Sequence, residues 1–100
     1  MHNIVSIAED QVRQAVLRAA GEAVAAGELP AEPMPAFVVE VPGDRAHGDF
    51  AVNAALASAK AFRRSPRQIA DVLCKHLDLT GTFLQKAEVA GPGFLNFFLS

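Results

Sequence analysis

The chain has 100 residues, of which 51% are hydrophobic and 20% are charged, the length and composition of one folded domain with a single core. This composition excludes a disordered tail, and polar residues interrupt every apolar run before the roughly 18 residues of a membrane span. A formal net charge of −2 excludes nucleic-acid binding that depends on bulk charge, so any such contact must be local. The first ten residues show no secretory signal pattern, and a single cysteine allows no intrachain disulfide, so we expect a reducing, cytoplasmic setting.

The first predicted element is a helix over residues 3–26, because small apolar residues recur at spacings of three and four. Its N-terminus has two candidates: Asn3 as the N-cap, or a capping box formed by Ser6 and Glu9. Gly27 ends the helix, and three prolines between residues 30 and 35 make the following linker stiff. The predicted apolar stripe consists of Ala8, Val12, Ala15, Val16, Ala19, Ala23 and Ala26.

A strand is predicted over residues 37–41, closed by Pro42 and Gly43, because the segment is rich in β-branched residues. After a polar loop, Asp49 is the predicted N-cap of a second helix. The residues expected on one face of that helix are Val52, Ala55, Leu56 and Ala59.

The third helix carries the clearest local signals, with Ser65 at the N-cap, Pro66 at the first helical position and Gln68 at the capping-box position. Its predicted buried side consists of Ile69, Val72, Leu73, His76 and Leu77.

The last third of the chain predicts a hairpin, with strands over 83–90 and 94–99 joined by a Gly-Pro-Gly turn. In the first strand, strict alternation places Leu84, Lys86 and Glu88 on one face, opposite Phe83, Ala87 and Val89. The predicted order is therefore helix, strand, helix, helix, strand, strand. Helices that need a flat apolar partner, and a hairpin that supplies one, define an α+β domain with helices on one face of an antiparallel sheet.

Three constellations are candidates for function. The first is the loop from His47 through Gly48 to Asp49, where a histidine and a carboxylate two residues apart could form an acid–base pair or bind a metal. Neither a nucleophile nor a third metal ligand is near in sequence. We therefore favour a structural role, with a glycine for the turn and an aspartate as a cap.

The second constellation is a basic cluster of four cations within eight residues, at the junction of the second and third predicted helices. These side chains suit phosphate groups, but cations at a helix C-terminus also complement the helix dipole on an ordinary solvated surface. The basic cluster consists of Lys60, Arg63, Arg64 and Arg67.

The third constellation is the hairpin turn, where Gly91 and Gly93 permit close approach of a ligand or another backbone. Strand alternation then places Leu95, Phe97 and Leu99 in the core, which leaves Phe94, Asn96 and Phe98 on the opposite face. An exposed phenylalanine can stack on an unstacked base, and an asparagine can donate and accept hydrogen bonds at a base edge.

Three spaced blocks resemble the N-terminal domain of arginyl-tRNA synthetases: HGDFAVNAA at 47–55, PRQIA at 66–70 and VAGPGFLNF at 89–97. The resemblance covers residues 8–99 and identifies His47, Gly48, Asp49 and Asn53 as part of the family's structural motif. It implies a single accessory domain over 1–100 that helps recognise the D-loop of tRNA(Arg), with Phe94 and Asn96 at the positions that contact the D-loop nucleotide.

The resemblance further implies that the catalytic and anticodon-binding domains lie outside residues 1–100. The remainder of the synthetase would act in cis and join arginine to tRNA with ATP. We expect this segment itself to have no catalytic residues, metal or cofactor, and no membrane partner. Two rival functions remain: a protein-interaction or scaffold domain with no RNA role, and a small hydrolase built on His47 and Asp49.

Overall fold

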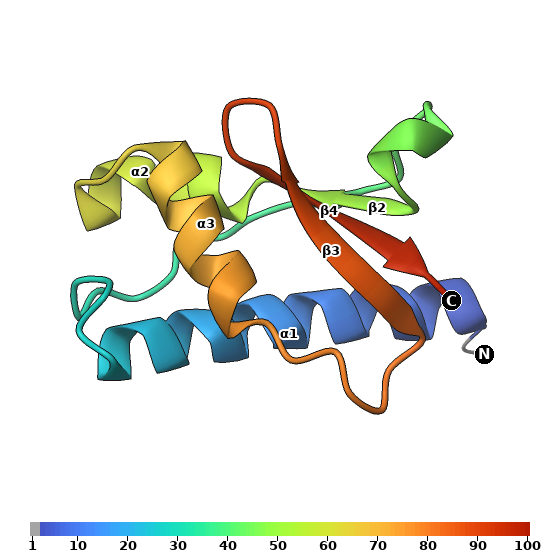
Figure 1. The fold of residues 1–100 in the computed structure, drawn as a ribbon, viewed down its shortest axis with the longest axis horizontal. Coiled ribbons are helices and arrows are strands. Elements are labelled where there is room, and N and C mark those ends of the chain that lie inside the picture. The colour runs from blue at the N-terminus through green and yellow to red at the C-terminus, as the bar shows by residue number, and fades with distance from the viewer. Residues whose placement is uncertain (1–2) are drawn as a thin grey trace.

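The computed structural model describes residues 3–100, without the side chain of Arg45, as a four-stranded antiparallel sheet with three α-helices on one face (Figure 1). The predicted α+β class is therefore confirmed. The order is helix, strand, strand, helix, helix, strand, strand, with one more strand than the sequence predicts. No helix in this described range is long and apolar enough to cross a membrane.

Helix α1 spans Ile4–Ala25, and Asn3 is its N-cap because its Oδ1 accepts a hydrogen bond from the Ser6 amide at 2.8 Å. This decides between the two predicted starts. The predicted stripe is buried up to Ala23, but Ala26 is exposed because it is the C-cap and lies beyond the last helical turn. Ala20 is buried in addition. The small side chains of this stripe allow α3 to pack closely on α1.

The middle of the chain corrects two predictions. Strand β1 is only Val39–Glu40, shorter than the predicted 37–41, and Phe50–Val52 forms an unpredicted strand, β2. A short 3₁₀ turn, η1 (Arg45–His47), lies between them. Asp49 is not a helix cap, because α2 begins only at Ala54 and spans Ala54–Phe62.

The different start of α2 also changes its buried face. Val52 belongs to β2, whereas Leu56 and Ala59 are only partly buried. The N-cap position is held by Asn53, whose side chain forms no capping bond and instead accepts a hydrogen bond from the Val38 amide at 2.7 Å. The buried residues of α2 are Ala54, Ala55, Ser58 and Phe62.

Helix α3 spans Pro66–His76 and confirms its predicted start in full: the Ser65 side chain accepts from the Gln68 amide, and the Gln68 side chain accepts from the Ser65 amide. Of its predicted buried side, Ile69 and Leu73 are fully buried. The others are partly buried, and Ala70 is buried in addition.

The hairpin strands are β3, Leu84–Ala90, and β4, Phe94–Leu99, and the sheet order is β1-β2-β4-β3. A register shift between Leu84 and Lys86 places an extra residue, Gln85, in β3. Such a bulge turns the strand, so Leu84 lies in the core and not on the face of Lys86, where strict alternation predicts it. On β4, Leu95 and Phe97 are fully buried in the core, as predicted.

Candidate nucleic-acid interface

The sheet face away from the helices is centred on Asn96. Strand pairing places it in one row with Ala51 of β2 and Glu88 of β3, and Ala51 is in turn paired with Glu40 of β1. Because side chains alternate along a strand, Phe94 and Phe98 lie on the same face, two residues to either side of Asn96. We call this surface the open face.

A pocket of about 440 Å³ lies over part of the open face, and it contains both residues that the resemblance placed at the RNA contact. Asn96 is 6% exposed and Phe94 is half-buried. Loop residues between β1 and β2 supply the other wall. The residues that line the pocket are Glu40, Pro42, Gly43, His47, Ala51, Ala90, Gly91, Phe94 and Asn96.

Phe98 is on the open face, as predicted, but does not line this pocket. The ammonium of Lys86 on the neighbouring strand lies 4.6 Å from the centre of the Phe98 ring, a cation–π contact. The same ammonium lies 3.6 Å from the Glu88 carboxylate. Lys86 therefore occupies one side of Phe98, which leaves Phe94 as the aromatic side chain of the pocket.

The hairpin turn is seated on the start of α3. Gly93 has a φ of +141° and is so close to Pro66 that a Cβ there would lie 2.7 Å from the Pro66 Cβ. The close approach predicted for the two glycines is thus made by protein at Gly93, whereas Gly91 is exposed and borders the pocket. The guanidinium of Arg67 donates a hydrogen bond to the Gly91 carbonyl at 3.0 Å.

The basic cluster is exposed, but its members do not all gather at the pocket. Arg67 reaches the turn, and its Nε also lies 3.8 Å from the Asp71 carboxylate. Arg63 caps α2 in the left-handed conformation, with a φ of +56°, and Lys60 lies in the last turn of α2. Arg64 lines a different hollow, beside Glu28, so the structure brings only one of the four cations to the edge of the pocket.

The loop around Gly48 has a structural role. Gly48 has a φ of +85°, and a Cβ there would lie 2.6 Å from the Phe97 carbonyl oxygen, so only glycine fits. Asp49 joins β2 to β4 twice: its amide donates to the Phe97 carbonyl, and its carboxylate accepts from the Leu99 amide, both at 2.8 Å. This carboxylate is therefore already bonded within the sheet, which disfavours an acid–base pair with His47.

Outside these three constellations, the reactive or metal-binding residue types in the described range include Cys74 and Glu28. Within it, His, Cys, Asp and Glu side chains form no group of three or more that could hold a metal ion. Burial raises the pKa of the Cys74 thiol, so this cysteine is not an activated nucleophile. Sequence reasoning missed that Glu28 accepts hydrogen bonds from both Lys75 and His76, which tie the loop after α1 to the end of α3.

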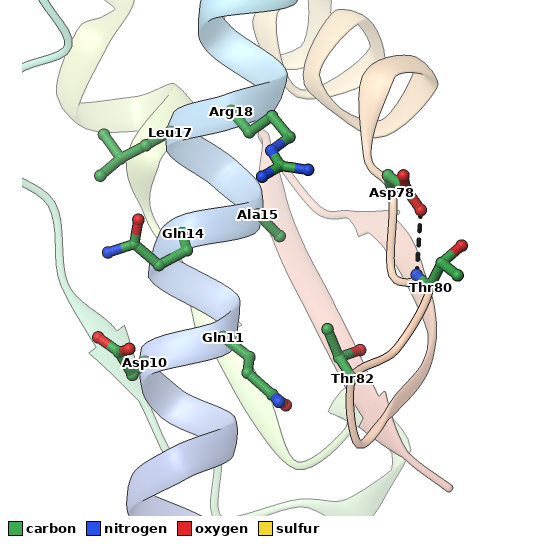
Figure 2. A pocket seen from close by; sticks show the side chains of 9 residues that line it. All are labelled: Asp10, Gln11, Gln14, Ala15, Leu17, Arg18, Asp78, Thr80 and Thr82. Carbon is green, nitrogen blue, oxygen red and sulfur yellow. Dashed lines mark hydrogen bonds between the residues drawn. The ribbon is translucent and has the colours of Figure 1, made fainter.

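A second hollow, of about 550 Å³, lies between α1 and the loop that joins α3 to β3 (Figure 2). It contains no residue of the three constellations predicted from the sequence. Figure 2 shows Gln11 and Arg18 of α1 on the side toward the loop residues Asp78, Thr80 and Thr82, whereas Gln14 points away from that loop. Hydrogen bonding to the Thr80 side chain and, with a smaller effect, to the Thr80 backbone holds the pKa of the Asp78 carboxyl below its usual range.

Sequence reasoning also missed two residues of the pocket's row, Glu40 and Ala51. In the predicted 37–41 strand, alternation places Glu40 on the face opposite Val39 and Val41. This polar position could have predicted that Glu40 lies on the face away from the core. Ala51 had no such signal, because its strand exists only through pairing with β4.

The structure is thus a small α+β domain that covers one face of its sheet with helices and has a pocket on the other face. The family model of the arginyl-tRNA synthetase N-terminal domain matches residues 7–99. The chain therefore belongs to the family of arginyl-tRNA synthetase N-terminal domains.

Curated relatives agree with this assignment. The chain is 40% identical over 100 residues to the arginine–tRNA ligase of Acetivibrio thermocellus, and the match covers 100% of the chain and 18% of that protein. It is 47% identical over 91 residues to the arginine–tRNA ligase of Desulfitobacterium hafniense, where the match covers 91% of the chain and 16% of that protein. The chain thus spans less than a fifth of the length of these relatives.

Proposed function

We propose that the open face binds tRNA, and that Phe94 and Asn96 contact a nucleotide of the D-loop of tRNA(Arg). The domain then serves an arginyl-tRNA synthetase, whose other domains join arginine to tRNA with ATP in the cytoplasm. The observation that carries the proposal is that both residues line one pocket on the face that the helices leave uncovered. Family membership supports the choice of RNA as the ligand.

The size and chemistry of the pocket suit an unpaired base. Its volume of about 440 Å³ falls within the roughly 300–1,000 Å³ typical of small-molecule pockets, which leaves room for a flat ring. Phe94 offers a ring for stacking, and the Asn96 amide offers both a donor and an acceptor to a base edge. The Glu40 carboxylate in the lining disfavours a phosphate at the same place, because two negative groups would repel each other.

Phosphates would instead contact the basic cluster. Arg67 is placed for this role, since it is exposed at the turn that borders the pocket, and Lys60 and Arg63 are exposed nearby in sequence. A domain with a net charge of −2 should bind RNA weakly by itself. The remainder of the synthetase, in cis, would supply most of the phosphate contacts.

The test is a titration of the chain with tRNA(Arg) and with a control RNA, at a low and a higher salt concentration. We expect binding at low salt that weakens as salt rises. Loss of one base–aromatic stack costs about 1–3 kcal/mol, so Phe94→Ala should weaken binding about 5- to 150-fold. Asn96→Ala should also weaken it, because the amide contact to the base is lost.

Phe83→Ala is the matched control, because it removes an exposed phenylalanine from the opposite end of the hairpin. If Phe94→Ala and Phe83→Ala bind tRNA(Arg) equally well, the assignment of Phe94 is wrong. If the unmodified chain binds no RNA at low salt, the alternative of a protein-interaction domain is favoured.

A further inference from the structure

Large apolar side chains are exposed together at the N-terminal end of α1. Ile4 is 59% exposed, Ile7 is 39% exposed, and Phe83, just before β3, is 42% exposed. Ile4, Ile7 and Gln11 follow one another at spacings of three and four, so they share one edge of the helix. The Gln11 side chain accepts a hydrogen bond from the Phe83 amide at 3.0 Å, which places Phe83 beside that edge. We call Ile4, Ile7 and Phe83 the apolar patch.

The apolar patch lies at the end of the sheet where β4 finishes. The amide and hydroxyl of Ser100 both donate hydrogen bonds to the Phe83 carbonyl, at 2.9 and 3.2 Å. Figure 1 agrees, since the C-terminus lies beside the first turns of α1. The pocket of the open face borders the turn at Gly91, at the other end of the hairpin. The two surfaces are therefore separate.

The hollow of Figure 2 continues this surface along α1. One end of the hollow is lined by Gln11, one helical turn after Ile7, and by Thr82, the residue before Phe83. The other end is lined by Arg18 and Asp78. Leu17, at 45% exposure, adds one more apolar side chain. Together they make a surface with an apolar end and a hydrogen-bonding end, which is the composition of a contact between domains.

The chemistry of this surface favours a polypeptide over RNA. The apolar patch consists of two isoleucines and one phenylalanine, none of which carries a charge or a hydrogen-bond donor for a phosphate. In the hollow, the carboxylates of Asp10 and Asp78 outnumber the single cation, Arg18. Exposed apolar side chains gathered in one place mark a contact with another protein surface.

We propose that the apolar patch and the adjoining hollow form the surface on which the remainder of the synthetase packs. The family places this domain at the N-terminus of the enzyme, and the matched segment is 18% of the relative from Acetivibrio thermocellus, so most of that polypeptide lies outside it. Because β4 of this chain ends beside Phe83, we infer that the polypeptide that follows the aligned segment in such a relative continues from this end of the sheet. The inference rests on family membership and on none of the RNA contacts.

The test is hydroxyl-radical footprinting read by mass spectrometry. The two samples are the isolated chain and the Acetivibrio thermocellus ligase with its aligned segment replaced by this chain. We expect oxidation of Phe83 and of Ile4 or Ile7 to fall several-fold in the ligase. Val41, which is 71% exposed and directly follows β1 at the opposite edge of the sheet from β3, is the internal control and should oxidise equally in both.

Equal oxidation of Phe83 and Ile7 in the two samples would overturn the proposal, as would protection confined to Val41 or to Phe94. Because no RNA is present, this outcome is independent of the tRNA titration. If the chain failed to bind RNA, protection of Phe83 and Ile7 in the ligase would still support this interface. If the footprint were negative, RNA binding by the open face would be unaffected.

Discussion

The seating of the hairpin turn on α3 makes Gly93 sensitive to any added side chain. Gly93→Ala would add a Cβ at a φ of +141°, a conformation that L side chains rarely adopt. The new atom would also lie 2.7 Å from the Pro66 Cβ, 2.8 Å from its carbonyl carbon and 2.9 Å from its carbonyl oxygen. Two of these three neighbours are backbone atoms, so α3 or the turn must move.

The backbone strain of such a residue costs about 1–3 kcal/mol, and overpacking of a well-packed contact costs about 1–3 kcal/mol more. We therefore expect Gly93→Ala to lower the free energy of unfolding by about 2–6 kcal/mol. Gly91→Ala is the matched control in the same turn. Its φ of +55° is the ordinary left-handed region, and its Cβ would meet only a Phe94 ring carbon at 4.0 Å, so its cost should be about 1–2 kcal/mol.

Urea unfolding followed by far-UV circular dichroism measures both variants, since the chain has no tryptophan or tyrosine for a fluorescence signal. The expected result is a clearly lower midpoint for Gly93→Ala than for Gly91→Ala, with similar slopes. If the two midpoints fall by the same amount, the close packing of the turn against Pro66 does not hold the hairpin in place.

Two further predictions concern the bonds that join distant segments. Asp49→Ala should lower the free energy of unfolding by about 1–3 kcal/mol, because the Leu99 amide loses its hydrogen-bond acceptor. Asp49→Asn keeps an acceptor oxygen, so this variant should lose less stability. Equal urea midpoints for the two variants would contradict this prediction. Hydrogen bonds from Lys75 and then His76 hold the pKa of Glu28 below its usual range. The ionised form is thus favoured in the folded state, so this stabilisation is present above the ordinary glutamate pKa of about 4.3 and is lost as the pH falls below it. Urea midpoints measured between about pH 6 and pH 3 should therefore fall more steeply for the unmodified chain than for Glu28→Gln, and parallel curves would refute the role of this contact.

Elements that carry their own local signals were predictable from the sequence. The start of α3 needs only Ser65, Pro66 and Gln68, which act on one another within a single turn. The hairpin needs only two alternating segments around a glycine-rich turn. The same alternation separated Phe94 and Asn96 from the core residues of β4, because β4 keeps a regular register along its length.

Features that depend on distant partners were not predictable. Phe50–Val52 is apolar and short, and it becomes a strand only through pairing with β4, more than forty residues later. Asp49 has the residue type of a helix cap, but its carboxylate instead accepts a hydrogen bond from the Leu99 amide at the end of β4. The bulge at Gln85 moves Leu84 to the core face of the sheet, and no glycine in this segment signals the bulge in the sequence. The pocket's second wall likewise comes from loop residues that only the fold brings to β4.

The most direct test of the central claim is a nuclear magnetic resonance titration of the isotope-labelled chain with the D-arm of tRNA(Arg), with the anticodon arm as the control RNA. The account predicts that the D-arm shifts the signals of Ala51, Phe94 and Asn96, the last through its side-chain amide, while the signals of Ile7 and Phe83 stay unchanged. The anticodon arm should leave the first group unaffected. Shifts confined to the α1 side of the molecule, or equal shifts with both RNAs, would contradict the claim that the open face recognises the D-loop.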